Sequence, residues 1–390
     1  MDKKNKNPNV PNLRFNEFSL PWHQMRIIDL LSFQNGINGT PEQYGKGIKY
    51  ISVGDILNND YITYDKIAGS IDINQETLKN YSVTYGDILF QRSSEIKEDI
   101  GRTNVYLDKD HTATFGGFVI RGKKIGDYNP TFFNYLLKSP SSRQSIVRLG
   151  AGAQHYNIGQ ENIKTLNFYF PDEEEQQKIA NLFSKIDERI QTQIKIIDTL
   201  LSEINSIRSL IFNKSSLKWI PLKDIVAEQD IKLKRGKVIP KHKKNLKYIY
   251  PVYSSSITNS GLMGYSDSYM FNQELITWSI DGGGNFFYRK KHKFNITNVS
   301  GYMILNENLF NYQFIVQSLI WQHEKLKFDY QTKAHPSVVE SLYKIPIMDL
   351  EEQHKYACLF SNLNEKYELE LHTLDLLNMQ KKYLLKNMFV

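Results

Sequence analysis

Short apolar runs separated by turn-forming residues dominate residues 15–170. Runs rich in β-branched and aromatic residues, bounded by Gly, Asn and Asp, are 48–53, 87–90 and 115–120. Such runs predict strands. The spacing changes after Pro130, where Phe133, Leu136 and Leu137 share one helical face and Pro fits the first turn. We therefore predict a mixed module of strands and short helices.

A different pattern follows Pro171, because no Gly or Pro occurs again before Pro221. Acidic residues crowd positions 172–175, where they favour a helix N-terminus. Apolar residues then recur at alternating spacings of three and four, as in a heptad: Ala180, Phe183, Ile190, Ile194, Ile197, Leu201, Ile204 and Ile211. The pattern predicts one helix of about 38 residues, roughly 57 Å long.

The start of this helix is repeated 177 positions later. Glu175-Gln-Gln-Lys-Ile-Ala-Asn-Leu-Phe-Ser returns as Glu352-Gln-His-Lys-Tyr-Ala-Cys-Leu-Phe-Ser, and the gapless match extends to Phe212 and Phe389. The second helix carries its own apolar stripe, which includes Ala357, Phe360, Tyr367, Leu371 and Leu374. A long amphipathic helix needs a partner, and each copy is the obvious partner of the other.

Polar residues interrupt both stripes at one repeat position, Asp187 in the first helix and Asn364 in the second. Buried polar residues of this kind fix register in coiled coils. Two polar residues on the helix surface with no specific role explain the pattern equally well, so both interpretations stand.

The repeat divides the chain into two mixed modules and two helices. Trp219 opens the second module much as Trp22 opens the first. The predicted fold class is α+β, with boundaries at 1–174, 175–213, 214–350 and 351–390. Similarity is close in the helices and thin inside the modules, which indicates a repeated frame with diverged contents.

Composition limits the functional classes. The chain has 390 residues, 41% of them hydrophobic, which suffices for two cored modules. Cys358 is the single cysteine, so a disulfide framework and a cysteine-built zinc site are excluded and a reducing, cytoplasmic location is expected. No apolar run approaches the roughly 20 residues of a membrane span. A net charge of +7 with 24 Tyr and 21 Phe suits a polyanionic partner.

Enzyme motifs are weak. The segment 39–46 has one residue too many for a phosphate-binding loop, and Gly282-Gly-Gly284 lacks dinucleotide-binding spacing. Asp87 followed by Glu95 and Lys97 has a loose nuclease-like order that random segments share. The His residues show no metal-ligand spacing. We therefore expect no catalytic residues, no metal and no cofactor.

The positive signal is electrostatic. A run of cations without an acid extends from Ile231 to Lys247, and a second cluster follows Phe286-Phe-Tyr288. Such cations neutralise DNA phosphates and release counterions, although a solvated surface explains them too. The predicted DNA-binding cations are Lys232, Lys234, Arg235, Lys237, Lys241, Lys243, Lys244, Arg289, Lys290 and Lys291.

Reading bases requires side chains that meet donors and acceptors in a groove. Equivalently placed polar loops follow the predicted strands of both modules. The candidates are Gln91, Arg92, Ser93, Ser94, Gln154, His155, Tyr156 and Asn157 in the first module, and Ser254, Ser255, Ser256, Trp278, Ser279, Lys333 and His335 in the second. The loops differ between modules, as expected if each reads a different sequence; ordinary loop drift gives the same result.

The whole chain resembles the specificity subunits of type I restriction and modification systems. The resemblance rests on the two Glu-Gln-x-Lys-x-Ala-x-Leu-Phe-Ser motifs, the Trp-led module starts and the opening Pro11-Asn-Leu-Arg-Phe. It implies two target-recognition domains, each binding half of a bipartite, asymmetric site in double-stranded DNA. It also implies that the two long helices pair antiparallel as a coiled coil, hold the recognition domains apart and dock two modification subunits.

The resemblance further implies that chemistry belongs to partners: methylation to the modification subunits, and ATP-driven translocation and cleavage to restriction subunits. The lysines outside the mutual stripe would contact either a partner or only water: Lys178, Lys185, Lys195, Lys355, Lys366 and Lys382. Two other classes remain as alternatives: a self-contained DNA-binding nuclease, which predicts metal-dependent cleavage, and a scaffold that binds DNA without sequence preference.

Overall fold

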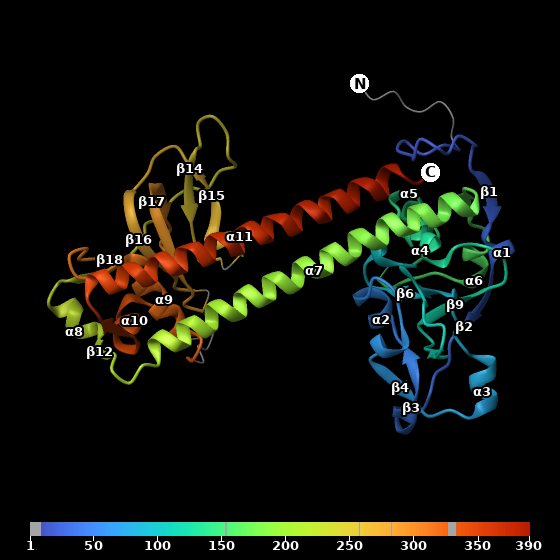
Figure 1. Cartoon of the computed structure of the whole chain (residues 1–390), viewed down its shortest axis with the longest axis horizontal. Coiled ribbons are helices and arrows are strands. Elements are labelled where there is room, and N and C mark those ends of the chain that lie inside the picture. The colour runs from blue at the N-terminus through green and yellow to red at the C-terminus, as the bar shows by residue number, and fades with distance from the viewer. Residues whose placement is uncertain (1–8, 153, 257, 282, 327–332) are drawn as a thin grey trace. The chain divides into compact units, whose positions relative to one another are not determined.

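The computed structural model describes residues 9–152, 154–256, 258–281, 283–326 and 333–390, and the chain divides into two units (Figure 1). Unit 1 comprises Met1–Gln193 and Thr373–Val390, and unit 2 comprises Ile194–His372. The two long helices, α7 (Glu173–Phe212) and α11 (Leu350–Asn387), each contribute residues to both units. Their ends lie within three residues of the predicted helix boundaries.

Unit 1 is built from short strands and helices around a four-stranded sheet ordered β2-β9-β5-β7 and a three-stranded sheet ordered β4-β3-β8. The strands are β1 (His23–Arg26), β2 (Leu31–Asn35), β3 (Tyr44–Ile51), β4 (Gly69–Ile71), β5 (Ile88–Gln91), β6 (Ser93–Ser94), β7 (Thr103–Val105), β8 (Thr114–Phe115), β9 (Val119–Lys124), β10 (Tyr156–Asn157) and β11 (Asn167–Phe170). The helices are α1 (Ile27–Leu30), η1 (Pro41–Gln43), α2 (Val53–Asn58), η2 (Tyr64–Lys66), α3 (Gln75–Asn80), η3 (Lys97–Asp99), α4 (Pro130–Lys138), α5 (Pro140–Val147) and α6 (Gln160–Ile163).

Unit 2 holds a six-stranded sheet ordered β13-β18-β16-β17-β14-β15. Its strands are β12 (Lys218–Pro221), β13 (Ile231–Arg235), β14 (Tyr250–Tyr253), β15 (Leu262–Ser266), β16 (Phe271–Ser279), β17 (Phe286–Ile296), β18 (Ser300–Leu305) and β19 (Lys344–Ile347). The helices are α8 (Leu222–Ala227), η4 (Thr258–Gly261), α9 (Tyr312–His323) and α10 (Pro336–Leu342).

The two units share one frame. β1 pairs antiparallel with β11, the strand before α7, and β12 pairs in the same way with β19, the strand before α11. A short helix with an Asn N-cap lies beside each pair. Asn129 accepts from Phe132 N at the start of α4, and Asn311 accepts from Phe314 N at the start of α9. The sequence repeat is therefore a repeat of structure.

The repeated glutamine explains why the motif is kept in both copies. Gln176 Oε1 accepts from Asn129 N at 2.9 Å while its Nε2 donates to Pro171 O at 2.9 Å. Gln353 Oε1 likewise accepts from Asn311 N at 2.9 Å, and its Nε2 donates to Met348 O at 2.8 Å. Both glutamines are buried, where backbone groups without partners would be destabilising. Each one ties the start of a long helix to the cap of a short helix.

The long helices run in opposite directions within each unit. In unit 1 the start of α7 packs against the end of α11, with the rings of Phe183 and Phe389 centred 5.7 Å apart. In unit 2 the end of α7 and the start of α11 share a core that includes Ile204 and Phe360. These contacts, with the mixed sheets and helices of both units, confirm the α+β class with antiparallel helices.

Phe212 and Phe389, which the repeat aligns, occupy equivalent places at the ends of their helices. Phe389 lies 5.7 Å from Phe132 of α4, and Phe212 lies 5.4 Å from Phe314 of α9. Each unit is therefore completed by the end of a long helix that begins in the other unit.

The buried stripe on α7 differs from the predicted one at two positions. Gln193 and Leu200 are buried, whereas Ile194 is half-buried and Leu201 is 42% exposed. Leu201 therefore lies outside the stripe. Both choices keep a spacing of three and four residues. Ile194 is more apolar than Gln193, whereas Leu200 and Leu201 are identical in type and only packing separates them. The other predicted positions on α7 up to Ile204 are buried, as are Ala357 and Phe360; the rest of the α11 set, Tyr367, Leu371 and Leu374, is half-buried.

Asp187 and Asn364 differ in the structure. Asp187 is buried and forms an ion pair with Lys381 of α11 at 2.6 Å, whereas Asn364 is half-buried. Within the described residues, no helix combines the length and apolarity required to cross a membrane.

Candidate nucleic-acid interface

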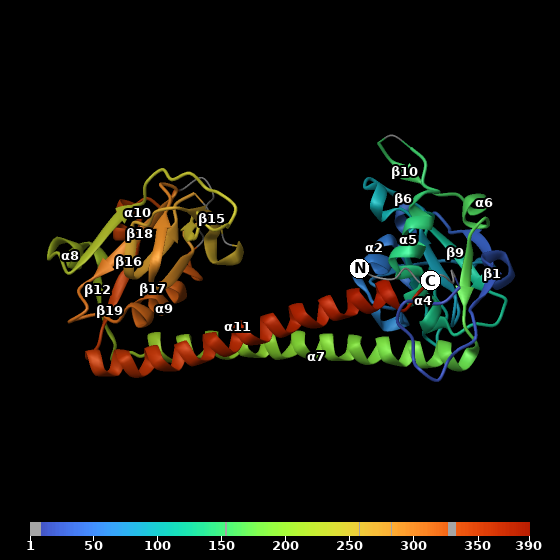
Figure 2. The same ribbon diagram turned by 90° about the horizontal axis from the view of Figure 1, so that it is seen from above.

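Two predicted base-reading loops of unit 1 form one ribbon. Ser93 and Ser94 of β6 pair antiparallel with Asn157 and Tyr156 of β10, and the Ser93 hydroxyl donates to Asn157 Oδ1. Figure 2 shows this ribbon on the side of unit 1 that faces away from α7. The predicted residues Gln154 and His155 lie next to β10, and both are exposed. The ribbon presents polar side chains from segments more than 60 residues apart.

Gln91 does not face solvent, in contrast to the prediction. It is 4% exposed at the end of β5, and its Nε2 donates to Ser93 O at 2.8 Å. It therefore supports the ribbon from within. Arg92 is exposed, and its Nη1 donates to Gly117 O at 3.3 Å. A run of polar residues after a strand does not reveal where the strand stops alternating between core and surface.

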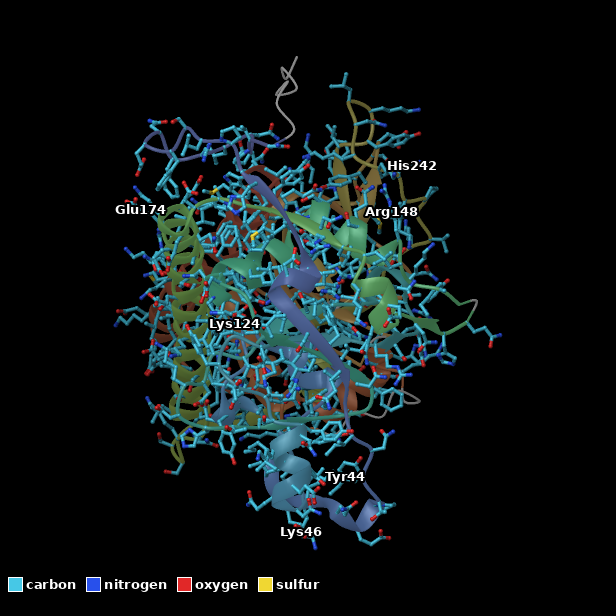
Figure 3. All side chains as sticks on the ribbon, turned by 90° about the vertical axis from the view of Figure 1, so that its right-hand side faces the viewer. Tyr44, Lys46, Lys124, Arg148, Glu174 and His242 are labelled. Carbon is cyan, nitrogen blue, oxygen red and sulfur yellow. The ribbon has the colours of Figure 1, made fainter. Side chains whose placement is uncertain are left out.

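A second exposed feature of unit 1 was not predicted. Tyr44 and Lys46 are exposed at the start of β3 (Figure 3). Lys66 Nζ, in η2, stands 3.6 Å from the centre of the Tyr61 ring. Both places combine a cation with an aromatic ring, and neither belongs to the predicted base-reading loops.

The predicted basic run of unit 2 lies on a sheet edge and the loop that follows it. β13 is the edge strand of the six-stranded sheet, and every predicted cation from Lys232 to Lys244 is exposed. Aromatic rings are interleaved with this run. His242 stacks on Tyr248 at 3.9 Å, and Lys244 Nζ lies 5.5 Å from the Tyr265 ring centre.

An open cavity of about 390 Å³ adjoins this loop. Its lining includes Lys237, His242, Tyr269 and Asn295. Lys293, the last residue of the basic cluster that follows Phe286-Phe-Tyr288, lies 4.8 Å from the Tyr269 ring centre. The mix of cations, rings and amides is typical of surfaces that contact a nucleic-acid backbone.

Trp278 and Ser279 are core residues, which corrects their prediction as base contacts. Trp278 is 1% exposed, and its Nε1 donates to Ala334 O at 2.8 Å. Gly301 lies so close beneath the indole that an added Cβ would stand 2.1 Å from it. Ser279 is fully buried, and its hydroxyl donates to Ser255 O at 2.9 Å.

The serine loop after β14 is partly buried. Ser254 is buried and accepts from Thr297 Oγ1 at 2.8 Å, whereas Ser255 and Ser256 are half-buried. Ser254 and Ser279 therefore support the loop, which leaves Ser255 and Ser256 at its surface.

The cluster at 289–291 divides into three environments. Arg289 is 5% exposed, and burial lowers the pKa of its guanidinium to about 10. Lys290 forms an exposed ion pair with Glu365 of α11 at 3.0 Å. Lys291 is exposed. A sequence cluster of like charge is thus not a single surface patch.

Lys333 and His335 lie after residues 327–332, which are outside the described residues; part of the predicted 331–335 loop therefore lies there. Lys333 pairs with Asp281 at 3.4 Å. His335 is half-buried at the N-cap of α10. Asp281 follows Ser279, so folding places the predicted segments 278–281 and 333–335 beside each other.

Asp87, the residue central to the nuclease alternative, supports a turn. It is buried, and its carboxylate accepts from Thr84 N at 3.0 Å and Lys124 N at 2.9 Å. Burial raises its pKa. Glu95 and Lys97 are exposed. The part of the chain that the structure describes contains no cluster of three or more His, Cys, Asp or Glu residues suited to a metal.

Known proteins resemble this chain in sequence. The family model described as "Type I restriction modification DNA specificity domain" matches twice, at residues 21–201 and 218–379. A type I specificity subunit of Mycoplasma pneumoniae is 34% identical over 115 residues, which cover 27% of this chain and 36% of that protein. The MjaX specificity subunit of Methanocaldococcus jannaschii is 27% identical over 214 residues, which cover 54% and 49% of the two chains. These matches therefore span a third to a half of either relative.

A solved structure extends the likeness in fold to nearly the whole chain. The S subunit of a type I restriction-modification system from M. genitalium superposes with a TM-score of 0.65 and 20% identity. The superposition covers 98% of this chain and 99% of that one.

Proposed function

Because the chain belongs to the family of type I restriction modification DNA specificity domains, we propose that it is the DNA specificity subunit of a type I complex. The recognition module of each unit reads one half of a bipartite, asymmetric site in double-stranded DNA. The chain directs chemistry that partner subunits perform, and the cytoplasm, where host DNA lies, is its place of action.

The observation that carries this proposal is a duplicated frame with different exposed loops. Gln176 and Gln353 make the same contacts in both units. The polar surfaces are unlike: unit 1 presents the β6–β10 ribbon, whereas unit 2 presents a basic edge strand and its loop. A pair of DNA readers for two different half-sites requires such a combination.

Exposed residues divide into two roles. Lysines of the 232–244 run fit phosphate contact, because a flexible cation gains affinity without reading sequence. Gln154 and His155 fit base contact, because amide and imidazole groups match groove donors and acceptors. Changing Lys243 to Ala should weaken all DNA alike, whereas Gln154→Ala should relax one half-site. Equal behaviour of the two variants would contradict this division.

Partner subunits would dock on the exposed faces of the long helices. Leu376, Met379 and Tyr383 recur at spacings of three and four on α11, and each is at least 47% exposed. An apolar stripe left open to water marks an interaction surface. We propose modification subunits as its occupants, with restriction subunits joining through the assembled complex.

The helices would also set the length of the unread gap. A continuous helix of 40 residues is about 60 Å long, more than one turn of B-DNA at roughly 34–36 Å. Inserting about one helical turn into α7 should lengthen the gap without changing the half-site bases. An unchanged gap would contradict the spacer role.

The decisive experiment is co-expression of the chain with a type I modification subunit, followed by single-molecule mapping of methyladenine across the host genome. A new bipartite motif is expected and would reveal both half-sites. A stable complex that leaves no new mark would favour the scaffold alternative. Metal-dependent cleavage by the purified chain, lost in Asp87→Asn, would favour the nuclease alternative; the burial of Asp87 argues against it.

A further inference from the structure

Arg289 is a buried cation with few partners. Its Nε donates to Thr277 Oγ1 at 3.0 Å, and none of the ion pairs formed among the described residues includes it. Its pKa of about 10 keeps it charged at neutral pH. A buried charge is expensive unless it is paired. The described residues of the chain therefore leave a need for an anion at this place.

The orientation of Arg289 is fixed by a bulge and a ring. The pairing of β16 with β17 steps from Leu275↔Arg289 to Gln273↔His292, so β17 carries one extra residue. Bulges re-aim side chains, and this one turns both Arg289 and His292 toward Tyr253. The guanidinium carbon lies 3.8 Å from the Tyr253 ring centre, and the Tyr253 hydroxyl lies 3.2 Å from His292 Nε2.

The serine loop lies over the free end of Arg289. A Cβ added to Gly261 would stand 3.3 Å from Arg289 Nη2, which places that nitrogen beside the loop. Asn259 and Ser260 both have a φ of 49°, a conformation that costs non-glycine residues about 1 kcal/mol or more. Among the described residues, the hydrogen bond of the Arg289 side chain is made by Nε, and the residue keeps 5% of its surface exposed. Its two terminal nitrogens are therefore left for another acceptor.

Resting on the proposed function, we propose that Arg289 binds a phosphate group of the DNA backbone through its two terminal nitrogens. The depth of Arg289 below the protein surface decides whether it contacts a phosphate or a base. A base edge lies at the bottom of a groove, and only a projecting side chain reaches it. A recessed arginine instead meets groups that project from the duplex, and those are phosphate oxygens. The half-buried Ser256 lies on the same side, because its carbonyl oxygen stands 3.3 Å from the same Cβ position of Gly261.

The test measures binding of the full chain to a fluorescent mixed-sequence duplex of about 30 base pairs at several salt concentrations. Arg289→Met should weaken binding by about tenfold or more and lower the salt slope by about one. Arg289→Lys keeps the charge and is gentler on the fold. It should preserve the slope and weaken binding less, because lysine meets phosphate as a point charge.

Arg189→Met is the matched control, since it removes one exposed arginine from α7, and it should leave affinity and slope unchanged. Thermal melting verifies that each variant is folded; if Arg289→Met unfolds, the slope of Arg289→Lys decides. Wild-type affinity and slope in Arg289→Met would overturn the inference while the proposed function stands. An altered methylation motif in Arg289→Lys would overturn it in favour of base reading. A wild-type chain that binds no duplex would refute the proposed function itself.

Discussion

Removing the ammonium of Lys381 should destabilise unit 1 by leaving a buried carboxylate without its cation. Lys381 Nζ lies 2.6 Å from Asp187 Oδ1 and 3.7 Å from Asp60 Oδ1. The other Asp187 oxygen accepts from the Tyr135 hydroxyl at 2.7 Å. In Lys381→Met, this hydroxyl remains as the described hydrogen-bond partner of Asp187, and the methionine fills much of the space of the lysine stem.

The expected loss of stability follows from how deeply the Lys381–Asp187 pair is buried. Breaking a fully buried pair costs about 3–5 kcal/mol, whereas exposed pairs contribute about 0–1 kcal/mol. The side chains of Lys381 and Asp187 are 22% and 9% exposed, which lies between these cases and nearer the buried one. We expect a loss of about 2 kcal/mol in the free energy of unfolding, or a fall of about 4–8 °C in the melting temperature of a unit of roughly 200 residues.

The assay is a double-mutant cycle by urea denaturation and calorimetry at neutral pH, with Lys381→Met, Asp187→Asn and the double variant. The double variant should lose less than the sum of the single losses, because neither charge remains alone. The repeat supplies a control. Asn364→Asp exchanges an amide and a carboxylate at the aligned, half-buried position of α11. Its effect on the free energy of unfolding should stay below about 1 kcal/mol.

Two results would refute this reasoning. One is a Lys381→Met variant whose stability lies within about 0.5 kcal/mol of the parent chain, the range of ordinary surface substitutions. The other is strict additivity in the cycle, which would mean that the pair contributes no coupling and that Asp187 is stabilised by Tyr135 alone.

Three further predictions concern other parts of the frame. Burial lowers the pKa of Lys138 to about 8 from 10.5; the folded state therefore binds fewer protons than the unfolded state between these values, and stability should rise with pH across that window. Lys138→Met should remove this rise in pH-dependent denaturation, and an unchanged profile would show that another group causes it. Gln353→Leu should cost about 2–4 kcal/mol by urea denaturation, because it leaves Asn311 N and the carbonyl of Met348 without a partner; a loss below 1 kcal/mol would mean that water replaces the side chain. Trp278→Phe should cost about 1–3 kcal/mol and leave the methylated motif unchanged, because the indole is buried; a new motif would restore Trp278 as a base contact.

The sequence alone determined the frame. The repeat at 177 positions and the long stretch without Gly or Pro before Pro221 predicted two helices whose ends lie within three residues of the observed ones. These features are visible in sequence because they are local: helix periodicity, capping and acid placement depend on residues a few positions apart. The exposed basic run from Lys232 to Lys244 was also predictable, since consecutive charges cannot all be buried.

Tertiary structure decided which polar residues face solvent. The sequence predicted four residues as DNA contacts that the structure buries: Gln91, Trp278, Ser279 and Arg289. For Trp278 and Ser279 the partners come from other segments of the chain, Ala334 O for Trp278 and Ser255 O for Ser279.

Only folding brought distant segments together. The β6–β10 ribbon joins residues 93–94 to 156–157, and the ion pair of Asp187 joins α7 to α11. The choice of Leu200 over Leu201 in the buried stripe has the same origin, because both satisfy the heptad and the facing surface selects one. Periodicity fixes which residues share a face of one element, whereas the packing of other elements against that face determines which residues lose water.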